Sequence, residues 1–447
     1  MEERTVEGYA EAVSFLENVP RFTKKNPLAD TERFFRRYYA EEGLGKIIHV
    51  AGTNGKGSVC AFLQQVCIES GYHVGMFVSP HLITTRERIV IDGEPVSEEV
   101  FSEAFNRLEE QIIDYNGHGN VYRPCYFERL FFIGISIFIE AGVEVTILET
   151  GLGGRLDATN VIKSPALCVI TEIGLDHMEY LGSSPEEIAG EKAGIIKPGV
   201  PVVFWDGRIE TTVVLKRRAA ECGSICHMVS NKDYKINEIR KKFIDFSVVS
   251  RYYDYGRLVA GSCAAYQAEN AAIAIRACEA LRDCGLERIT GPLIQEGIRN
   301  MRWRGRMEEI LPDVYIDGAH NEDGVEAFVR SVTGNCETDF DGKRCFLIFS
   351  AVKDKRYDNM IEKLCGLAPV TDFVITHIPG GRGADLAELE GQFRIHTDKR
   401  VQAFARIEDA IGFALDNRGE KGIIYIVGSL YLAGSVESLL GGKHDKF

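Results

Sequence analysis

The stretch VAGTNGKGSV at residues 50–59 decides the fold, because a strand pattern enters it and a helix pattern leaves it. The apolar run Ile47–Ala51 predicts a buried strand, and the amphipathic run Ser58–Ser70 predicts a helix. The glycines between them let successive backbone N–H groups surround an anion at the positive end of that helix. Lys56 would then reach the β- and γ-phosphates of a nucleotide, and the Ser58 hydroxyl would bind Mg²⁺. One extra glycine separates this lysine from the serine of the usual phosphate-loop pattern, and a Gly-rich turn that binds nothing is the alternative.

Outward from this loop, short apolar runs alternate with longer amphipathic stretches along the chain. Continuous apolar runs of this length fit strands that are covered on both faces, as in a parallel sheet. Amphipathic stretches such as Pro185–Ile196 and Gln267–Cys284 predict the covering helices. The further strands are predicted at Val74–Val78, Val145–Glu149, Leu167–Thr171, Val202–Trp205, Phe346–Ser350, Phe373–His377 and Ile423–Val427.

The alternation pauses near Gly297–Met301, which predicts a boundary between two domains at residues 1–298 and 299–447. We therefore expect an α/β protein. Its N-terminal phosphate-loop domain would hold a mainly parallel sheet, and its smaller C-terminal domain would be a Rossmann-like α/β fold. The segment Asp233–Gly261 alternates polar and aromatic residues and predicts antiparallel strands at the edge of the first sheet.

Net charge, apolar runs and cysteine content indicate which kinds of binding partner and which cellular compartment to expect. The 447 residues include 52 Lys and Arg against 66 Asp and Glu, a net charge of −14 that does not suit a general nucleic-acid binder or an anionic membrane surface. The longest apolar run, Leu130–Ile139, is too short to cross a bilayer. The 12 cysteines are scattered, which is typical of a reduced, cytosolic protein, and the acidic, polar residues Met1–Ala10 are not expected to be a signal peptide. We expect a cytoplasmic monomer that binds small molecules, without nucleic acid or membrane.

Seven ordered blocks span residues 46–434. The most specific block is Leu148–Asn160, in which Thr150 is unusual. The other blocks are Val50–Val59, Ser79–Leu82 with Glu87 and Arg88, Ile173–His177, Ala189–Ile195, Asp317–Asn321 and Gly428–Leu432. In these blocks the chain resembles the folylpolyglutamate synthase and dihydrofolate synthase family of the Mur ligase superfamily.

The resemblance implies an ATP-dependent ligase that adds L-glutamate to dihydropteroate, to the γ-carboxylate of a (tetrahydro)folate, or to both. The reaction would pass through an acyl phosphate. Residues 1–298 would bind ATP and the pterin, and residues 299–447 would bind glutamate. Closure of the two domains would exclude water from the acyl phosphate.

The ATP site expected from the loop and the resemblance draws on both domains. Arg306 would stabilise charge on the transferred phosphate, with an ion pair as the alternative role. Two positions depart from the family: Tyr266 stands where His is usual, and Arg304 where Pro is usual. The expected ATP-binding residues are Gly52, Thr53, Asn54, Gly55, Lys56, Gly57, Ser58, Asn270, Arg306, Asp317 and His320.

A metal site is expected at Glu149, which ends an apolar strand just before a Gly-rich loop, where open α/β sheets bind ligands. His177 follows the next strand. The resemblance assigns two Mg²⁺ sites, allows a monovalent cation, and places a carbamate on Lys192 in the predicted helix Glu186–Ile196. A lysine paired with a nearby carboxylate, such as Glu191 or Glu149, is the alternative. The metal ligands would be Ser58, Ser79, Glu149, His177 and carbamylated Lys192, and the catalytic residues Lys56, Glu149, His177 and Lys192.

The pterin would need an apolar slot with polar anchors. Cys125–Glu128 resembles a Thr-x-Phe-Glu block of the family, although a plain core role for Phe127 is equally open. Thr85 and Cys125 replace residues that are usual in the family. The expected pterin contacts are Tyr126, Phe127, Glu128, Leu156, Asp157 and Ala158, and the expected cations for the glutamate carboxylates are Arg88, Arg155, Lys353 and Arg382.

Two other functions compete with this one. A Mur-type ligase that adds an amino acid to a UDP-sugar peptide would share the phosphate loop, but the 45 residues before Lys46 are too few for a UDP-binding domain. A phosphate-loop ATPase without ligase activity would leave Glu149, His177 and the block Asp317–Asn321 unexplained.

Overall fold

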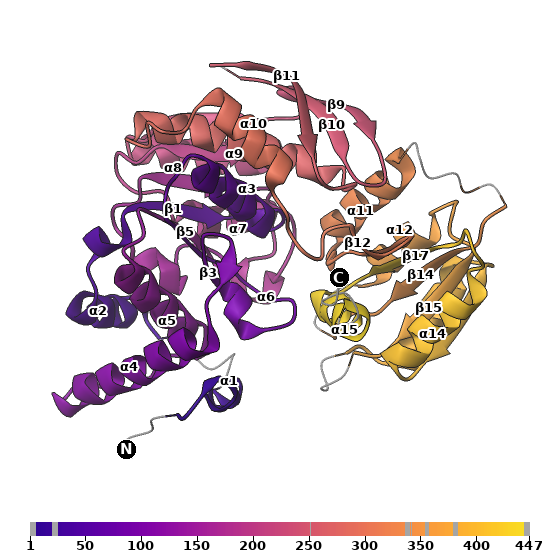
Figure 1. The fold of residues 1–447 in the computed structure, drawn as a ribbon, viewed down its shortest axis with the longest axis horizontal. Helices are drawn as coiled ribbons and strands as arrows, with labels where there is room; N and C mark the ends of the chain where they lie inside the picture. Colours follow the sequence, from indigo (N-terminus) through magenta and orange to yellow (C-terminus); the bar gives the residue numbers. More distant parts are fainter. Residues whose placement is uncertain are drawn as a thin grey trace. The chain divides into compact units, whose positions relative to one another are not determined.

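The computed structural model describes residues 6–19, 26–250, 252–335, 340, 342–353, 357–378 and 383–441. The chain forms two compact units. The first unit comprises Met1–Asp233, Val249–Tyr255 and Asn270–Met301, and the second comprises Tyr234–Val248, Gly256–Glu269 and Arg302–Phe447. Figure 1 shows the ribbon coloured along the sequence, with many of its helices and strands labelled.

The first unit is built on an eight-stranded sheet with the order β4-β3-β2-β5-β1-β6-β7-β8. The six strands from β2 to β8 in this order are parallel, and the short strands β3 and β4 pair antiparallel at one edge. The central strand β1 has the phosphate loop at its carboxyl end, between its neighbours β5 and β6. The strands are β1 (Lys46–Ala51), β2 (Val74–Phe77), β3 (Ile89–Ile91), β4 (Glu94–Pro95), β5 (Val145–Glu149), β6 (Leu167–Ile170), β7 (Val202–Trp205) and β8 (Cys226–Val229).

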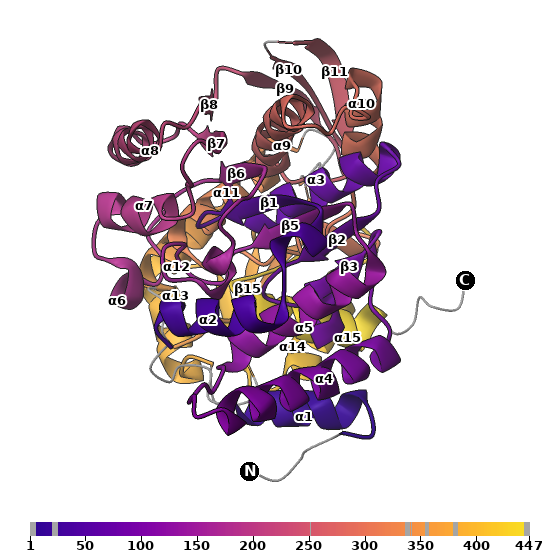
Figure 2. The same cartoon turned by 90° about the vertical axis from the view of Figure 1, so that its left-hand side faces the viewer.

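Helices cover both faces of this sheet, which is why its strands read as continuous apolar runs. Figures 1 and 2 show α3 and α10 together on one face and α5 on the other. The apolar run Leu130–Ile139 lies in α5 and is buried in an aromatic-rich core, and no described helix is long and apolar enough to span a membrane. The helices are α1 (Tyr9–Asn18), α2 (Leu28–Tyr38), α3 (Lys56–Glu69), α4 (Glu98–Gly117), α5 (Tyr126–Ala141), α6 (Met178–Leu181), α7 (Pro185–Ala193), α8 (Ile209–Glu221) and α10 (Gly291–Asn300), with α9 (Tyr266–Asp283) shared between the units.

The antiparallel strands expected in Asp233–Gly261 exist, but their expected place at the edge of the first sheet is wrong. β9 (Tyr234–Ile239), β10 (Ile244–Val249) and β11 (Asp254–Ala260) form a separate three-stranded sheet with the order β11-β10-β9. Consecutive strands pair with each other in this sheet, and β9 and β10 run antiparallel. The edge beside β7 is already taken by β8, a short strand that the apolar pattern did not reveal.

The second unit holds a six-stranded sheet with the order β12-β13-β17-β14-β15-β16, in which only β12 is antiparallel to its neighbour. The strands are β12 (Glu308–Leu311), β13 (Val314–Ile316), β14 (Cys345–Phe349), β15 (Asp372–Thr376), β16 (Arg400–Phe404) and β17 (Ile423–Val427). The helices are α11 (Glu322–Gly334), α12 (Tyr357–Cys365), α13 (Leu386–His396), α14 (Ile407–Asn417) and α15 (Leu430–Gly441). The prediction of an α/β protein with two sheet-bearing parts is therefore confirmed.

Candidate active site

The loop between β1 and α3 is held in an open turn by the segment that follows β6. The backbone N–H of Thr53 donates to the Glu172 carbonyl oxygen at 2.7 Å, and the Thr171 hydroxyl donates to the Asn54 carbonyl oxygen at 2.6 Å. Ser58 is buried in the first turn of α3. These bonds fix the loop backbone at Thr53 and Asn54, just before the N-terminus of α3, the end of a helix that favours an anion.

Asn270 from α9 lies directly against this loop. Gly55 has a left-handed φ of 85°, and a Cβ built there would lie 2.3 Å from the Asn270 Oδ1 atom. Only glycine meets both demands, because a side chain would strain the backbone and collide with the amide. The structure thus brings Asn270 to the phosphate loop, far from it in sequence, as expected of a nucleotide contact.

Glu149, Ser79 and Lys56 meet where β5, β2 and β1 end. The Glu149 side chain is only 3% exposed, and its Oε2 atom accepts a hydrogen bond of 3.0 Å from the Ser79 backbone N–H. The Lys56 Nζ atom lies 3.7 Å from the other carboxylate oxygen. The lysine charge offsets the cost of burying the carboxylate. Lysine, carboxylate and phosphate loop therefore share one site in the first unit.

Lys192 joins α7 to the same loop. Its side chain is 3% exposed, and its Nζ atom donates to the Gly52 carbonyl oxygen at 2.7 Å. Glu191, one of the carboxylates expected as an alternative partner, binds the Arg155 guanidinium at 2.7 Å, and the ion-paired role of Lys192 stays a prediction. Burial, together with the charge of Lys56, lowers the pKa of Lys192 to about 7.

His177 begins α6 in the loop after β6. Its φ is 50°, its backbone N–H donates to the Asp176 carboxylate at 2.8 Å, and its side chain is 39% exposed. Glu149 and His177 follow β5 and β6, which flank β1, so both lie at the same edge of the sheet.

The ligands expected for Mg²⁺, the Glu149 carboxylate and the hydroxyls of Ser58 and Ser79, are oxygen donors of the kind that Mg²⁺ prefers. Mg²⁺ is commonly held by one or two carboxylates and keeps several waters. Among the described residues no three His, Cys, Asp or Glu side chains cluster tightly enough to hold a metal alone. A second ion near Lys192 would need oxygens that a lysine amine does not have, which a carbamate would supply.

The Gly-rich loop after Glu149 is organised by Asp157. One carboxylate oxygen accepts the backbone N–H groups of Gly151 and Leu152, each at 3.0 Å. A Cβ on Gly151 would lie 2.5 Å from the Phe127 ring, so this glycine allows the ring to approach. Phe127 also packs edge-on against Phe77 at 5.6 Å, so it is part of the core and of the loop's surroundings.

The remaining pterin candidates differ in exposure. Leu156 is 51% exposed, whereas Glu128 is buried and its carboxylate accepts hydrogen bonds from the Cys125 backbone N–H and the Thr31 hydroxyl. The Cys125 side chain completes the capping box of α5, so this departure from Thr keeps the capping role. Glu128 thus has a structural role, and its contact with a pterin stays a prediction, as do those of Tyr126 and Ala158.

In the second unit, Asp317 follows β13 and gathers three donors. It accepts hydrogen bonds from the Tyr266 hydroxyl at 2.5 Å, the Met307 backbone N–H at 3.0 Å and the Ala319 backbone N–H at 2.8 Å. Burial raises its pKa, and the charge of Arg306 opposes that rise. His320 lies in the same turn, where its Nδ1 atom is 2.7 Å from the Gly318 carbonyl oxygen. The three predicted residues of this unit therefore lie close together.

Two sequence departures in this unit have structural explanations. Tyr266, where the family usually has His, donates to Asp317. Arg304, where the family usually has Pro, forms an ion pair with the buried Glu437 of α15, with 2.6 Å between Nε and Oε1.

The cations expected for glutamate are in different situations. Arg88 donates to His81 at 2.9 Å and lies over the Tyr126 ring, and Arg155 is paired with Glu191. Lys353 is exposed, and Arg382 lies outside the described residues.

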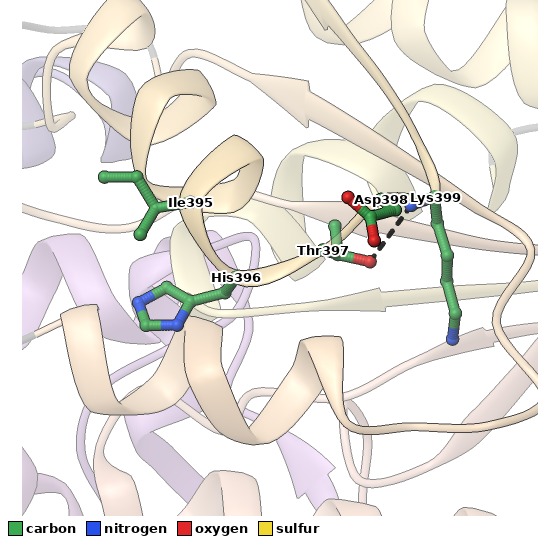
Figure 3. A pocket seen from close by; sticks show the side chains of 5 residues that line it. All are labelled: Ile395, His396, Thr397, Asp398 and Lys399. Atoms are coloured by element: carbon green, nitrogen blue, oxygen red, sulfur yellow. Dashed lines mark hydrogen bonds between the residues drawn. The ribbon is translucent and has the colours of Figure 1, made fainter.

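A separate hollow lies at the turn between α13 and β16. Figure 3 shows the five side chains that line it, Ile395, His396, Thr397, Asp398 and Lys399. Lys399 donates its backbone N–H to the Thr397 hydroxyl at 3.2 Å and its Nζ to the Leu367 carbonyl oxygen at 2.7 Å. No predicted site residue lines this hollow, and we assign no function to it.

The fold and the first-unit site define a nucleotide-binding α/β protein of the phosphate-loop class with a second α/β unit. Residues 305–430 match the family described as "Mur ligase, glutamate ligase domain". The chain is 34% identical over 439 residues to the dihydrofolate synthase/folylpolyglutamate synthase of Bacillus subtilis, covering 97% of this chain and 99% of that relative. The chain therefore belongs to the folylpolyglutamate synthase and dihydrofolate synthase family, which confirms the resemblance.

Solved structures agree with this assignment. A structure of Escherichia coli FolC in complex with DHPP and ADP superposes with a TM-score of 0.84 at 26% identity, covering 99% of this chain and 100% of that one. Mycobacterium tuberculosis folylpolyglutamate synthase complexed with ADP gives a TM-score of 0.86 at 26% identity, covering 97% and 98%.

Proposed function

We propose that this protein is an ATP-dependent ligase that adds L-glutamate to dihydropteroate, to the γ-carboxylate of a (tetrahydro)folate, or to both. The observation that carries the proposal is the buried Glu149 carboxylate, held between the Lys56 ammonium and the Ser79 backbone N–H beside the phosphate loop. The Bacillus subtilis relative carries both activities in its name, and a relative from Lacticaseibacillus casei, 30% identical over 459 residues, is a folylpolyglutamate synthase.

The chain's own residues would activate the acceptor carboxylate by orienting ATP. The N–H groups of the loop and the Lys56 ammonium would hold the phosphates while a carboxylate oxygen attacks the γ-phosphorus and ADP leaves. The glutamate amine would then attack the carbonyl carbon of the acyl phosphate, and inorganic phosphate and a proton would leave. Held by Glu149, Ser58 and Ser79, Mg²⁺ would supply neutralisation of phosphate charge.

Several finer assignments belong to the same proposal. We assign ATP and pterin binding to residues 1–298 and the glutamate step to residues 299–447. A second Mg²⁺ would need His177 and carbamylated Lys192, and a monovalent cation could bind as well. We expect a cytoplasmic monomer that binds no nucleic acid.

An assay with dihydropteroate and tetrahydrofolate side by side tests the proposal. ADP release should require both glutamate and one of these pterins, and each product should be longer by one glutamate. Lys56→Ala should lower turnover at least about a hundredfold because it removes the cation beside the phosphates. The exposed Lys232→Ala serves as the matched control. ATP hydrolysis without either substrate would favour a simple ATPase, and amino-acid transfer to a UDP-sugar peptide would favour a Mur-type ligase.

A further inference from the structure

His49 is a polar residue at the centre of an apolar strand. It lies on β1, pairs with Leu148 of β5 and Cys168 of β6, and has an exposed fraction of 0%. Burying an imidazole there costs free energy unless the ring is hydrogen-bonded. Its neighbours on both strands are apolar, so any compensating partner must come from outside the sheet.

That partner is Thr159, far away in sequence. The His49 Nε2 atom lies 2.8 Å from the Thr159 Oγ1 atom, and the Thr159 hydroxyl donates to Asp157 Oδ1 at 2.6 Å. A hydroxyl has one proton, which goes to the carboxylate, so Thr159 must accept from His49. The imidazole is therefore the neutral tautomer with its proton on Nε2.

The surroundings of the other ring nitrogen, Nδ1, are consistent with a neutral ring protonated on Nε2. His49 Nδ1 is buried and has no hydrogen-bond partner, so a second proton there would have no acceptor. Burial and the charge of Lys197 lower the pKa of His49 to about 3. The residue is a permanent donor near neutral pH.

The chain of hydrogen bonds from His49 through Thr159 to Asp157 continues to the Gly-rich loop that follows Glu149. Asp157 uses its second oxygen, Oδ2, to hold the N–H groups of Gly151 and Leu152. Gly151 and Leu152 follow Glu149 closely in the chain. Gly151 lies so near the Phe127 ring that a Cβ there would be 2.5 Å from it. The strand that carries the phosphate loop is thus tied to the loop that carries the predicted pterin contacts.

We propose that His49 is a positioning residue for the pterin: through Thr159 and Asp157 it fixes the loop at residues 151–154 in the shape that receives the substrate ring. This inference rests on the proposed function. His49 touches no substrate, and it acts only through the two side chains that follow it.

Paired substitutions test the donor directly. The amide nitrogen of Gln can take the place of imidazole Nε2, whereas that of Asn lies near Nδ1, so His49→Gln keeps the donor and His49→Asn loses it. Thr159→Ser and Thr159→Val form a second pair. Thr146→Val, which removes another buried hydroxyl bond of the same sheet, to the Leu44 carbonyl oxygen at 2.6 Å, is the control for general destabilisation.

Two measurements decide the result. Hydrogen exchange at Gly151 and Leu152 in the substrate-free protein should accelerate about tenfold in His49→Asn and Thr159→Val, and stay within about twofold of wild type in the other variants. The KM for the pterin should rise about tenfold in the same two variants, with the KM for ATP unchanged.

Unchanged exchange in both donor-deficient variants would overturn the proposal, as would faster exchange with an unchanged pterin KM. The proposal would also be overturned if Thr146→Val raised the KM for the pterin as much as His49→Asn and Thr159→Val do. A wild-type chain without glutamate-ligase activity would instead refute the proposed function, and the exchange data would then decide alone whether His49 holds the loop.

Discussion

Replacing Lys192 by Met should change how the stability of the first unit depends on pH. Lys192 is 3% exposed and its pKa is lowered to about 7 by burial and by Lys56, whereas an unfolded lysine titrates near its ordinary value of 10.5. The gap of about 3.5 corresponds to about 5 kcal/mol at about 1.36 kcal/mol for each unit of pKa.

The sign follows from which state holds the proton. Between pH 7 and 10.5 the Lys192 side chain keeps a proton in the unfolded chain that it has lost in the folded chain, so its contribution to the wild-type free energy of unfolding rises with pH. Below pH 7 both states are protonated, and the penalty of the buried charge is constant. The Met side chain of Lys192→Met does not titrate. The free energy of unfolding of wild type minus that of Lys192→Met should therefore rise by roughly 2 kcal/mol between about pH 7.5 and 9.5.

Urea unfolding without metal or bicarbonate measures this difference. The chain has two tryptophans, so a Trp303→Phe background leaves Trp205 of β7 to report on the first unit. Lys232→Met, an exposed lysine of the same unit, should run parallel to wild type. Parallel curves for wild type and Lys192→Met would refute the reasoning.

The same pKa predicts that Lys192 can be carbamylated. Near neutral pH about half of the amine is unprotonated and can attack CO₂, forming an N–C bond with loss of a proton. Native mass spectrometry in bicarbonate should show the mass of one CO₂ added to wild type and absent from Lys192→Met.

Three further predictions concern other contacts of the site and the second unit. Glu149→Gln should raise the Mg²⁺ concentration for half-maximal turnover about tenfold or more, because the buried carboxylate becomes neutral; a magnesium titration measures this. Arg304→Pro should destabilise the second unit by about 1–3 kcal/mol, because it leaves the Glu437 carboxylate buried without its cation, and adding Glu437→Leu should restore most of the loss in urea unfolding. Tyr266→Phe removes the hydroxyl that donates to the buried acid after β13, and the KM for ATP should rise several-fold with folding intact; an unchanged KM would count against this acid as a nucleotide contact.

Much of the fold could be read from local pattern. The run Ile47–Ala51 lies in a strand because consecutive apolar residues suit a sheet covered on both faces. The helix predicted at Ser58–Ser70 forms as α3 (Lys56–Glu69), and most of its residues are buried. The sequence pattern did not predict short strands such as β8 and β12, because half-exposed runs of mixed polarity have no clear hydrophobic period. The sequence also did not predict that β9, β10 and β11 form a separate sheet. Strands can join a sheet only at an edge that has no partner yet, and the residue pattern does not show which edges are already paired.

The sequence alone determined the α/β class, the phosphate loop and the family, because these depend on residues that are adjacent or closely spaced in the chain. The tertiary structure decided what those residues meet. The Asn270 amide lies at Gly55, the Lys192 ammonium lies on the Gly52 carbonyl, and the Nε2 proton of His49 is given to Thr159. Partners so distant in sequence become neighbours only when the sheet orders its strands, and burial then sets the pKa of each group.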